Sequence, residues 1–165
     1  MSGFYEESMS NGIGWRSVLF ISGCPHYCEG CQNPQTWNES YGTLFNENYY
    51  LKSILNNKMI DGITLSGGEP LTEKHIGELI PFLRKIKKNN LNIWCYTGFV
   101  FEELIKRTNP ETKEILNLID VVVDGKFVSN LKDASLRFRG SSNQRIIDVQ
   151  KSLKQNKIIL WEDDF

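Results

Sequence analysis

The chain has 165 residues, of which 40% are hydrophobic, and its formal net charge is -1. This length fits one domain with a substantial core, so we expect residues 1–165 to form a single domain. The near-neutral charge gives no electrostatic basis for binding nucleic acid, and no apolar run is long enough to span a bilayer. The polar, acidic segment 1–11 is unlike a signal peptide, so we expect a cytoplasmic protein with neither nucleic-acid nor membrane partners.

Short apolar runs alternate along the chain with amphipathic segments, and they predict strands and helices respectively. The predicted strands span residues 16–22, 62–66, 92–97, 120–124 and 157–161. The predicted helices span residues 46–57, 73–88, 101–107 and 111–118. Because strands alternate with helices, the sequence predicts an α/β fold in which a mostly parallel sheet is connected by helical crossovers.

The first four predicted strands all run into short segments that contain glycine. These segments are Gly23-Cys24, Gly67-Gly68-Glu69-Pro70, Thr97-Gly98 and Asp124-Gly125-Lys126. The carboxyl ends of parallel strands share one edge of a sheet, and ligands bind there. Glycine also lets the backbone approach a ligand closely because it has no Cβ. We therefore expect the four strand exits to converge on one binding site.

Three of the four cysteines, Cys24, Cys28 and Cys31, lie in one loop with the spacing C-x3-C-x2-C. In a reducing compartment such a group indicates metal binding or catalysis more than disulfides. A cubane iron–sulfur cluster normally takes four thiolates, so three would leave one iron open to bind another molecule. The alternatives are a structural zinc site with His26 as the fourth ligand and three unligated thiols, which would be exposed to oxidation.

The segment Cys-Pro-His-Tyr-Cys-Glu-Gly-Cys at 24–31 resembles the cluster loop of the radical S-adenosylmethionine superfamily. In that superfamily three cysteines hold a [4Fe–4S] cluster, whose open iron binds the amino and carboxylate groups of S-adenosylmethionine. Gly-Gly-Glu-Pro at 67–70 resembles the second motif, which contacts the amino group. Gly30 stands where the superfamily often has an aromatic residue, and it resembles one branch, the activating enzymes of anaerobic ribonucleotide reductase. Segments 11–16, 32–38, 120–127 and 139–145 resemble the same branch.

This resemblance implies a partial (β/α) TIM-like barrel of about five to six mostly parallel strands. It implies an enzyme that uses the cluster and S-adenosylmethionine to generate a 5′-deoxyadenosyl radical and to install a glycyl radical on anaerobic ribonucleoside-triphosphate reductase. The partners would be the large subunit of that reductase and an electron donor such as flavodoxin or ferredoxin. The alternatives are an activase of the pyruvate formate-lyase type or a small-molecule radical enzyme and, outside enzymes, a metal-stabilised electron-transfer or interaction module.

The resemblance also assigns roles to residues. Cys24, Cys28 and Cys31 are the expected cluster ligands. The residues expected to contact S-adenosylmethionine are Gly30, Cys31, Gln32, Gly67, Gly68, Glu69, Pro70, Asp124, Asn143 and Arg145. Outside these motifs we expect Cys95 to be buried in the core, His75 to lie at the surface, and Trp37 to pack the cysteine loop against the body of the protein.

Overall fold

The computed structural model describes residues 1–162 and shows a six-stranded sheet whose strands lie side by side in chain order. β2 to β5 pair in parallel, whereas β1 and β6 pair antiparallel to their neighbours and form the two edges. The strands are β1 (Gly3–Ser8), β2 (Arg16–Ile21), β3 (Gly62–Gly67), β4 (Asn92–Tyr96), β5 (Val121–Asp124) and β6 (Arg145–Asp148). The predicted α/β architecture, a partial and mostly parallel barrel, is confirmed.

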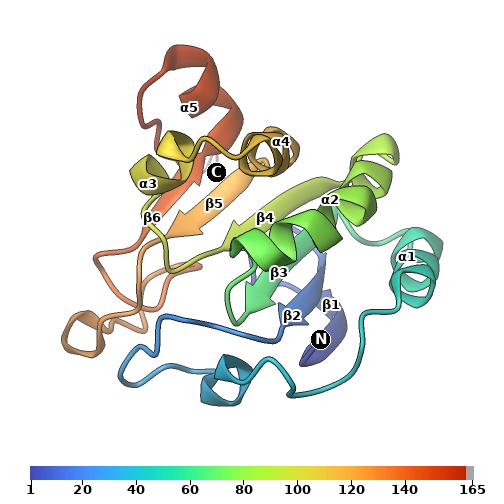
Figure 1. Ribbon diagram of the computed structural model, residues 1–165, viewed down its shortest axis with the longest axis horizontal. Helices are drawn as coiled ribbons and strands as arrows, with labels where there is room; N and C mark the ends of the chain where they lie inside the picture. Colours follow the sequence, from blue (N-terminus) through green and yellow to red (C-terminus); the bar gives the residue numbers. More distant parts are fainter. Residues whose placement is uncertain (163–165) are drawn as a thin grey trace.

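Helical crossovers connect the parallel strands and cover one face of the sheet, with α2 and α4 side by side on it (Figure 1). The side-chain oxygens of Asn46, Thr72, Asn109 and Asp148 cap four of the helices by accepting hydrogen bonds from backbone N–H groups of the first turn. The helices are α1 (Glu47–Asn56), α2 (Glu73–Lys88), α3 (Phe101–Lys106), α4 (Pro110–Leu118) and α5 (Val149–Gln155), with 3-10 turns at Pro34–Trp37 and Ser129–Leu131.

The two faces of the sheet are packed differently because successive strand residues point to opposite sides. On the helix-covered face Leu19, Leu65, Cys95 and Val122 lie in one row of the strand register, and all four are fully buried in the main core. On the other face, Trp94 is the largest member of a small cluster with Val121 and Val123. Phe20, Ser66 and Tyr96, nearer the carboxyl ends of their strands on this face, line a cavity.

Arg16 closes the amino-terminal end of the inner face. Its guanidinium donates to Thr64 Oγ1 at 2.8 Å and to the carbonyl of Ile63 at 2.6 Å, and it lies 5.5 Å from the centre of the Trp94 ring. The side chain is completely buried, and burial lowers the pKa of Arg16 to about 10, which still leaves it charged at neutral pH. With this end filled, a cavity on the inner face has to open at the carboxyl edge of the strands.

Three features of the sheet edges differ from the sequence predictions. β1 was not predicted, because its residues are half-buried or exposed and its side chains show no clear alternation. β6 was not predicted either, because it has only four residues and follows a polar segment. The strand predicted at 157–161 was wrong: β6 already occupies the edge beside β5, and the later run forms only one bridge, between Leu160 and Ile147.

Candidate functional site

A cavity of about 450 Å³ lies at the carboxyl edge of the sheet, within the size range of small-molecule sites. All four predicted strand exits contribute to its lining, which confirms their convergence. They do so through Cys24 after β2, Gly67 and Gly68 at β3, Thr97 and Gly98 after β4, and Gly125 and Lys126 after β5.

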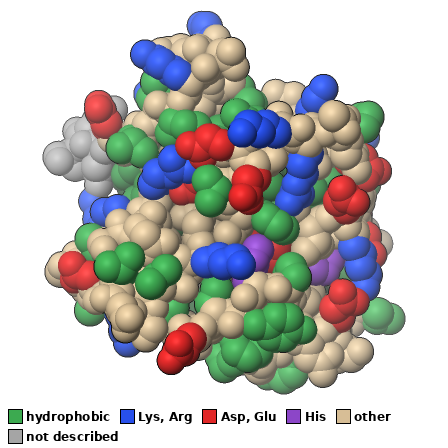
Figure 2. Space-filling model, turned by 60° about the vertical axis from the view of Figure 1, so that its left-hand side comes forward, with side chains coloured by type: hydrophobic (Ala, Val, Ile, Leu, Met, Phe, Trp, Pro, Cys, Tyr) green, Lys and Arg blue, Asp and Glu red, His purple; other side chains and the backbone are tan. Residues whose placement is uncertain are grey.

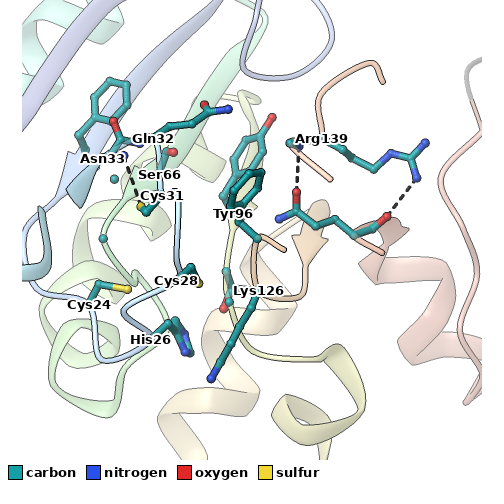
Figure 3. A pocket seen from close by; sticks show the side chains of 18 of the residues that line it. Cys24, His26, Cys28, Cys31, Gln32, Asn33, Ser66, Tyr96, Lys126 and Arg139 are labelled. Carbon is teal, nitrogen blue, oxygen red and sulfur yellow. Dashed lines mark hydrogen bonds between the residues drawn. The ribbon is translucent and has the colours of Figure 1, made fainter. Parts of the chain in front are cut away.

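Cys24, Cys28 and Cys31 line one wall of this cavity, with Arg139 on the opposite side and Tyr96 and Lys126 between them (Figure 3). All three cysteines are free and partly exposed. The backbone N–H of Asn33 donates to Cys31 Sγ at 3.3 Å. Burial raises the pKa of the Cys24 thiol and the charge of Glu69 adds to this, while a backbone hydrogen bond at His26 opposes it. Metal binding to Cys24 would therefore release a proton.

The arrangement of donors fits a multi-iron cluster better than a zinc ion. Within residues 1–162, no three His, Cys, Asp or Glu side chains lie close enough together to hold one metal ion. His26, the proposed fourth zinc ligand, instead places Nε2 2.6 Å from Glu69 Oε2. In a four-iron cluster each thiolate binds a different iron, so the sulfur atoms lie farther apart than the ligands of a single zinc ion. Trp37 Nε1, a buried donor at the cavity, has no hydrogen-bond partner among the described residues, so it is available to a bound group.

Glu69 is the buried centre of the cysteine side of the cavity. Its carboxylate accepts hydrogen bonds from the Thr97 hydroxyl at 2.8 Å, from the Gly98 N–H at 2.7 Å and from the Leu71 N–H at 2.8 Å, in addition to its contact with His26. The residue is 0% exposed. These contacts tie the end of β3 to the end of β4 and to the cysteine loop.

The prediction that His75 lies at the surface was wrong. His75 lies in the first turn of α2, but that turn packs under the loop after β3, and the residue is only 8% exposed. Its ring nitrogen Nδ1 lies 2.7 Å from the carbonyl oxygen of Glu69. Cys95 is buried in the core as predicted, and Trp37 packs edge-on against Tyr27 while also lining the cavity.

Glycine is needed at two strand exits because the cysteine loop approaches them closely. A Cβ on Gly68 would lie 2.4 Å from the carbonyl oxygen of Gly23, and a Cβ on Gly98 would lie 2.3 Å from the His26 ring. Both distances are too short for real atoms. At Gly125 the nearest atom would be 3.7 Å away, so space alone would admit a side chain, and it is the φ of +91° that favours glycine there. Ligand access was the expected reason for these glycines, but at Gly68 and Gly98 the fold itself excludes a side chain.

Beside the cavity, at the end of β5 and the start of β6, an ion-pair network lies on the helix-covered face of the sheet. Arg145 lies between Asp124 and Glu102, with Nε 3.0 Å from Asp124 Oδ1 and Nη1 2.9 Å from Glu102 Oε1. Asp124 also accepts from the Phe101 N–H at 2.8 Å and is 1% exposed. The hydrogen bond from Arg145 lowers the pKa of Glu102 to about 2, and the two carboxylates raise the pKa of Arg145.

Two amide side chains fix the loop after β5. Asn143 donates from Nδ2 to the carbonyl of Lys126 at 2.9 Å, and Gln144 donates from Nε2 to the carbonyl of Gly125 at 3.0 Å. Gln144 Oε1 accepts in turn from the N–H groups of Gly140 and Ser141, at 2.9 and 3.2 Å. These bonds hold the segment before β6 against the exit of β5.

The residues predicted to contact S-adenosylmethionine fall into two groups. Those that line the cavity are Cys31, Gln32, Gly67 and Gly68. The others lie beside the cavity and are hydrogen-bonded to, or packed against, other parts of the protein. They are Gly30, Glu69, Pro70, Asp124, Asn143 and Arg145. Their contacts with a bound molecule stay a prediction.

Sequence reasoning gave no individual role to several lining residues, among them Tyr96 and Gln144, and it predicted Lys126 only as part of the β5 exit. Tyr96 belongs to β4 and is on the same face as Trp94, so the two-residue period of the strand could have indicated its direction. Burial raises the pKa of Tyr96, which keeps its phenol protonated. Lys126 directly follows the glycine of the β5 exit, and it extends toward the cysteine side of the cavity (Figure 3).

On the face shown in Figure 2, acidic and basic side chains are interspersed, and neither charge dominates. This mixed pattern agrees with the net charge of -1. No helix within residues 1–162 has the length and apolar character needed to cross a membrane.

Comparison with known proteins agrees with this site. A family model described as "4Fe-4S single cluster domain" matches residues 10–147. A protein of Haemophilus influenzae named "anaerobic ribonucleoside-triphosphate reductase-activating protein" is 38% identical over 151 residues, which cover 87% of this chain and 94% of the relative. The chain belongs to the reductase-activating protein family.

Two other relatives that carry the same name match this chain to a similar extent. The Escherichia coli (strain K12) member is 40% identical over 147 residues, covering 86% of this chain and 93% of its own length. The member from Enterobacteria phage T4 is 41% identical over 146 residues, covering 86% and 89%. Membership implies one [4Fe–4S] cluster together with S-adenosylmethionine, and the three cysteines and the cavity beside them fit this pair of groups.

Proposed function

We propose that this protein is the enzyme that activates anaerobic ribonucleoside-triphosphate reductase by installing a glycyl radical on it. The observation that carries the proposal is the common cavity wall formed by the three cysteines and the glycine pair 67–68. The names of relatives that are 38–41% identical over most of the chain support the choice of reductase.

In this function Cys24, Cys28 and Cys31 would hold the cluster as its three thiolate ligands, which would leave one iron available to S-adenosylmethionine. When bound and reduced, the cluster would supply the electron for cleavage of S-adenosylmethionine. Gln32, Gly67 and Gly68 line the space next to the cysteines and therefore bind and orient the S-adenosylmethionine. We keep Gly30, Pro70, Asp124, Asn143 and Arg145 as further members of the binding region, and Glu69 borders it from within the fold.

The reductase itself is the protein substrate, and the open sheet supports its access to the cavity. β1 and β6 are the two edges of the sheet, so the barrel does not close around the site. A glycine-bearing segment of the reductase can enter from the open side and reach the molecule held beside the cysteines. The chain would then act as one domain over residues 1–165.

The electron that each turnover consumes would come from a separate protein such as flavodoxin or ferredoxin. The chain has four cysteines, and Cys95, the one outside the loop, is completely buried in the core. A second cluster that could pass electrons to the first therefore lacks ligands. We place the protein in the cytoplasm, because its three thiols need reducing conditions to hold the cluster.

The test is formation of a glycyl radical on purified anaerobic ribonucleoside-triphosphate reductase. The anaerobically reconstituted chain is mixed with the reductase, S-adenosylmethionine and a chemical reductant, and the radical is followed by electron paramagnetic resonance. We expect the signal to appear with this reductase and to be absent with the Cys28→Ala variant. A signal on pyruvate formate-lyase but not on the reductase would support the alternative activase. A purified protein that contains stoichiometric zinc and no iron–sulfur cluster would support the interaction module.

A further inference from the structure

Both histidines of the chain hydrogen-bond the same glutamate. His26 reaches the carboxylate of Glu69 from the cysteine loop, with a distance of 2.6 Å between Nε2 and Oε2. His75 reaches the carbonyl oxygen of Glu69 from α2, with a distance of 2.7 Å from Nδ1. The side chains of His26 and Glu69 are 7% and 0% exposed, so their contact is shielded from water.

The carboxylate of Glu69 is occupied by groups of the protein itself. Oε1 accepts from the Leu71 N–H and the Thr97 hydroxyl, and Oε2 accepts from the Gly98 N–H and faces His26. Four donors are a full set for the two oxygens of an ionised carboxylate. Gly67 and Gly68 line the cavity, whereas Glu69 points into the protein.

The fold makes room for His26 at this position. Gly98 lacks the Cβ that would lie 2.3 Å from the imidazole ring, and the Phe99 ring packs edge-on against His26 with centroids 4.7 Å apart. His26 is only two residues from both Cys24 and Cys28. A fixed imidazole therefore fixes the loop that carries two of the three thiols.

We propose that His26 and Glu69 are a positioning pair, in which the Glu69 carboxylate holds the cysteine loop against the exits of β3 and β4 instead of contacting the bound molecule. This inference rests on the proposed function and refines one part of it. It predicts that loss of the His26 donor misplaces the cluster relative to Gly67 and Gly68, and so weakens binding of S-adenosylmethionine.

The test compares His26→Gln with His26→Leu. Glutamine carries its Nε2 the same number of bonds from Cα as the histidine Nε2, so it can still donate to Glu69, whereas leucine cannot. Each variant is reconstituted anaerobically, its iron and sulfide are measured, and S-adenosylmethionine is titrated against the cluster spectrum. We expect His26→Gln to bind with an affinity near that of the wild type, and His26→Leu to bind about tenfold more weakly per assembled cluster.

His75→Leu is the matched control, because it removes the other histidine bonded to Glu69 but leaves the carboxylate and the cysteine loop in contact. We expect it to lower the melting temperature without a comparable loss of affinity. Equal weakening by His75→Leu and His26→Leu would show a general effect on folding and would overturn the inference. Wild-type affinity in His26→Leu, or failure of His26→Gln to rescue, would overturn it too.

The outcome for the wild type separates this inference from the proposed function. If the wild-type cluster does not respond to S-adenosylmethionine at all, the proposed function fails. If the wild type responds and the His26 variants respond equally well, only the positioning role fails.

Discussion

Two regions flank the cavity, the cysteine side and the adjoining ends of β5 and β6, and they are held together by different interactions. On the cysteine side, one buried carboxylate, Glu69, collects donors from three segments, and two of these donors are backbone N–H groups. On the side of β5 and β6, the buried Asp124 is paired with the cation of Arg145, which also reaches the partly exposed Glu102. The first side depends on close backbone packing, and the second depends on charge.

This difference matters because the cysteine side has to hold a cluster in one position relative to the glycine pair 67–68. Backbone N–H groups cannot change rotamer, so they fix a carboxylate more firmly than long side chains do. The ion pairs of the charged side lie at the start of β6, which is an edge strand of the sheet. Four substitutions test whether the two sides differ in this way.

The largest effect is expected for Cys28→Ala on the cysteine side. With only two thiolates left in the loop, the cluster loses a required ligand, and both iron content and 5′-deoxyadenosine formation should fall to background. Iron and sulfide analysis and product chromatography measure these two quantities. Cys95→Ala is the control, since that buried cysteine lies away from the cavity and should cost about 1 kcal/mol of stability without loss of the cluster. Turnover by Cys28→Ala would contradict the assigned ligand set.

Arg145→Leu should have the largest effect on the charged side. The substitution leaves Asp124, whose side chain is 2% exposed, without a cation, and we expect it to lower the free energy of unfolding by about 3 kcal/mol. Urea unfolding followed by circular dichroism measures the change. The double variant Asp124→Asn/Arg145→Leu should recover part of the loss, because no unpaired buried charge remains. If the single variant were as stable as the wild type, the ion pair would not be what holds this side.

Gly98→Ala tests the close packing of the cysteine side. The new methyl group would overlap the His26 ring and push it from Glu69, so we expect a loss of about 2 kcal/mol and weaker binding of S-adenosylmethionine. Gly77→Ala is the matched control in α2, where the nearest atoms to a Cβ are Glu111 oxygens at 3.5 Å. That control should gain about 0.5–1 kcal/mol, since alanine favours a helix more than glycine does. Equal stability of the two variants would contradict the packing argument.

Glu102→Gln should have the smallest effect. The Glu102 side chain is 39% exposed, so its pair with Arg145 should contribute less than about 1 kcal/mol. The pKa of Glu102 is lowered from 4.5 to about 2 by the hydrogen bond from Arg145, so the stabilisation is present above pH 4.5 and is lost as the pH falls toward 2. Urea unfolding at several pH values should show wild type and variant converging over this range. A constant difference at all pH values would mean that the charge of Glu102 is not involved.

The sequence predicted much of the cavity because its signals are local. The cysteine spacing and the strand exits are each readable within ten residues, and strand order places them at one edge. It did not predict which side chains around the cavity contact one another. Asp124 and Arg145 were expected as separate candidates for binding, and the antiparallel pairing of β5 with β6 places them opposite each other. That pairing joins residues about 20 positions apart through a strand too short to recognise.

By itself the sequence determined the three-cysteine loop, the glycine-rich exits and the parallel order of the central strands, because spacing and periodicity are properties of neighbouring residues. Only the tertiary structure decided that His26 and His75 both bond Glu69 and that Gly98 makes room for one of these rings. These contacts join segments between 6 and 72 positions apart along the chain. Burial and donor–acceptor pairing across such separations depend on how the whole sheet packs, and no local pattern records them.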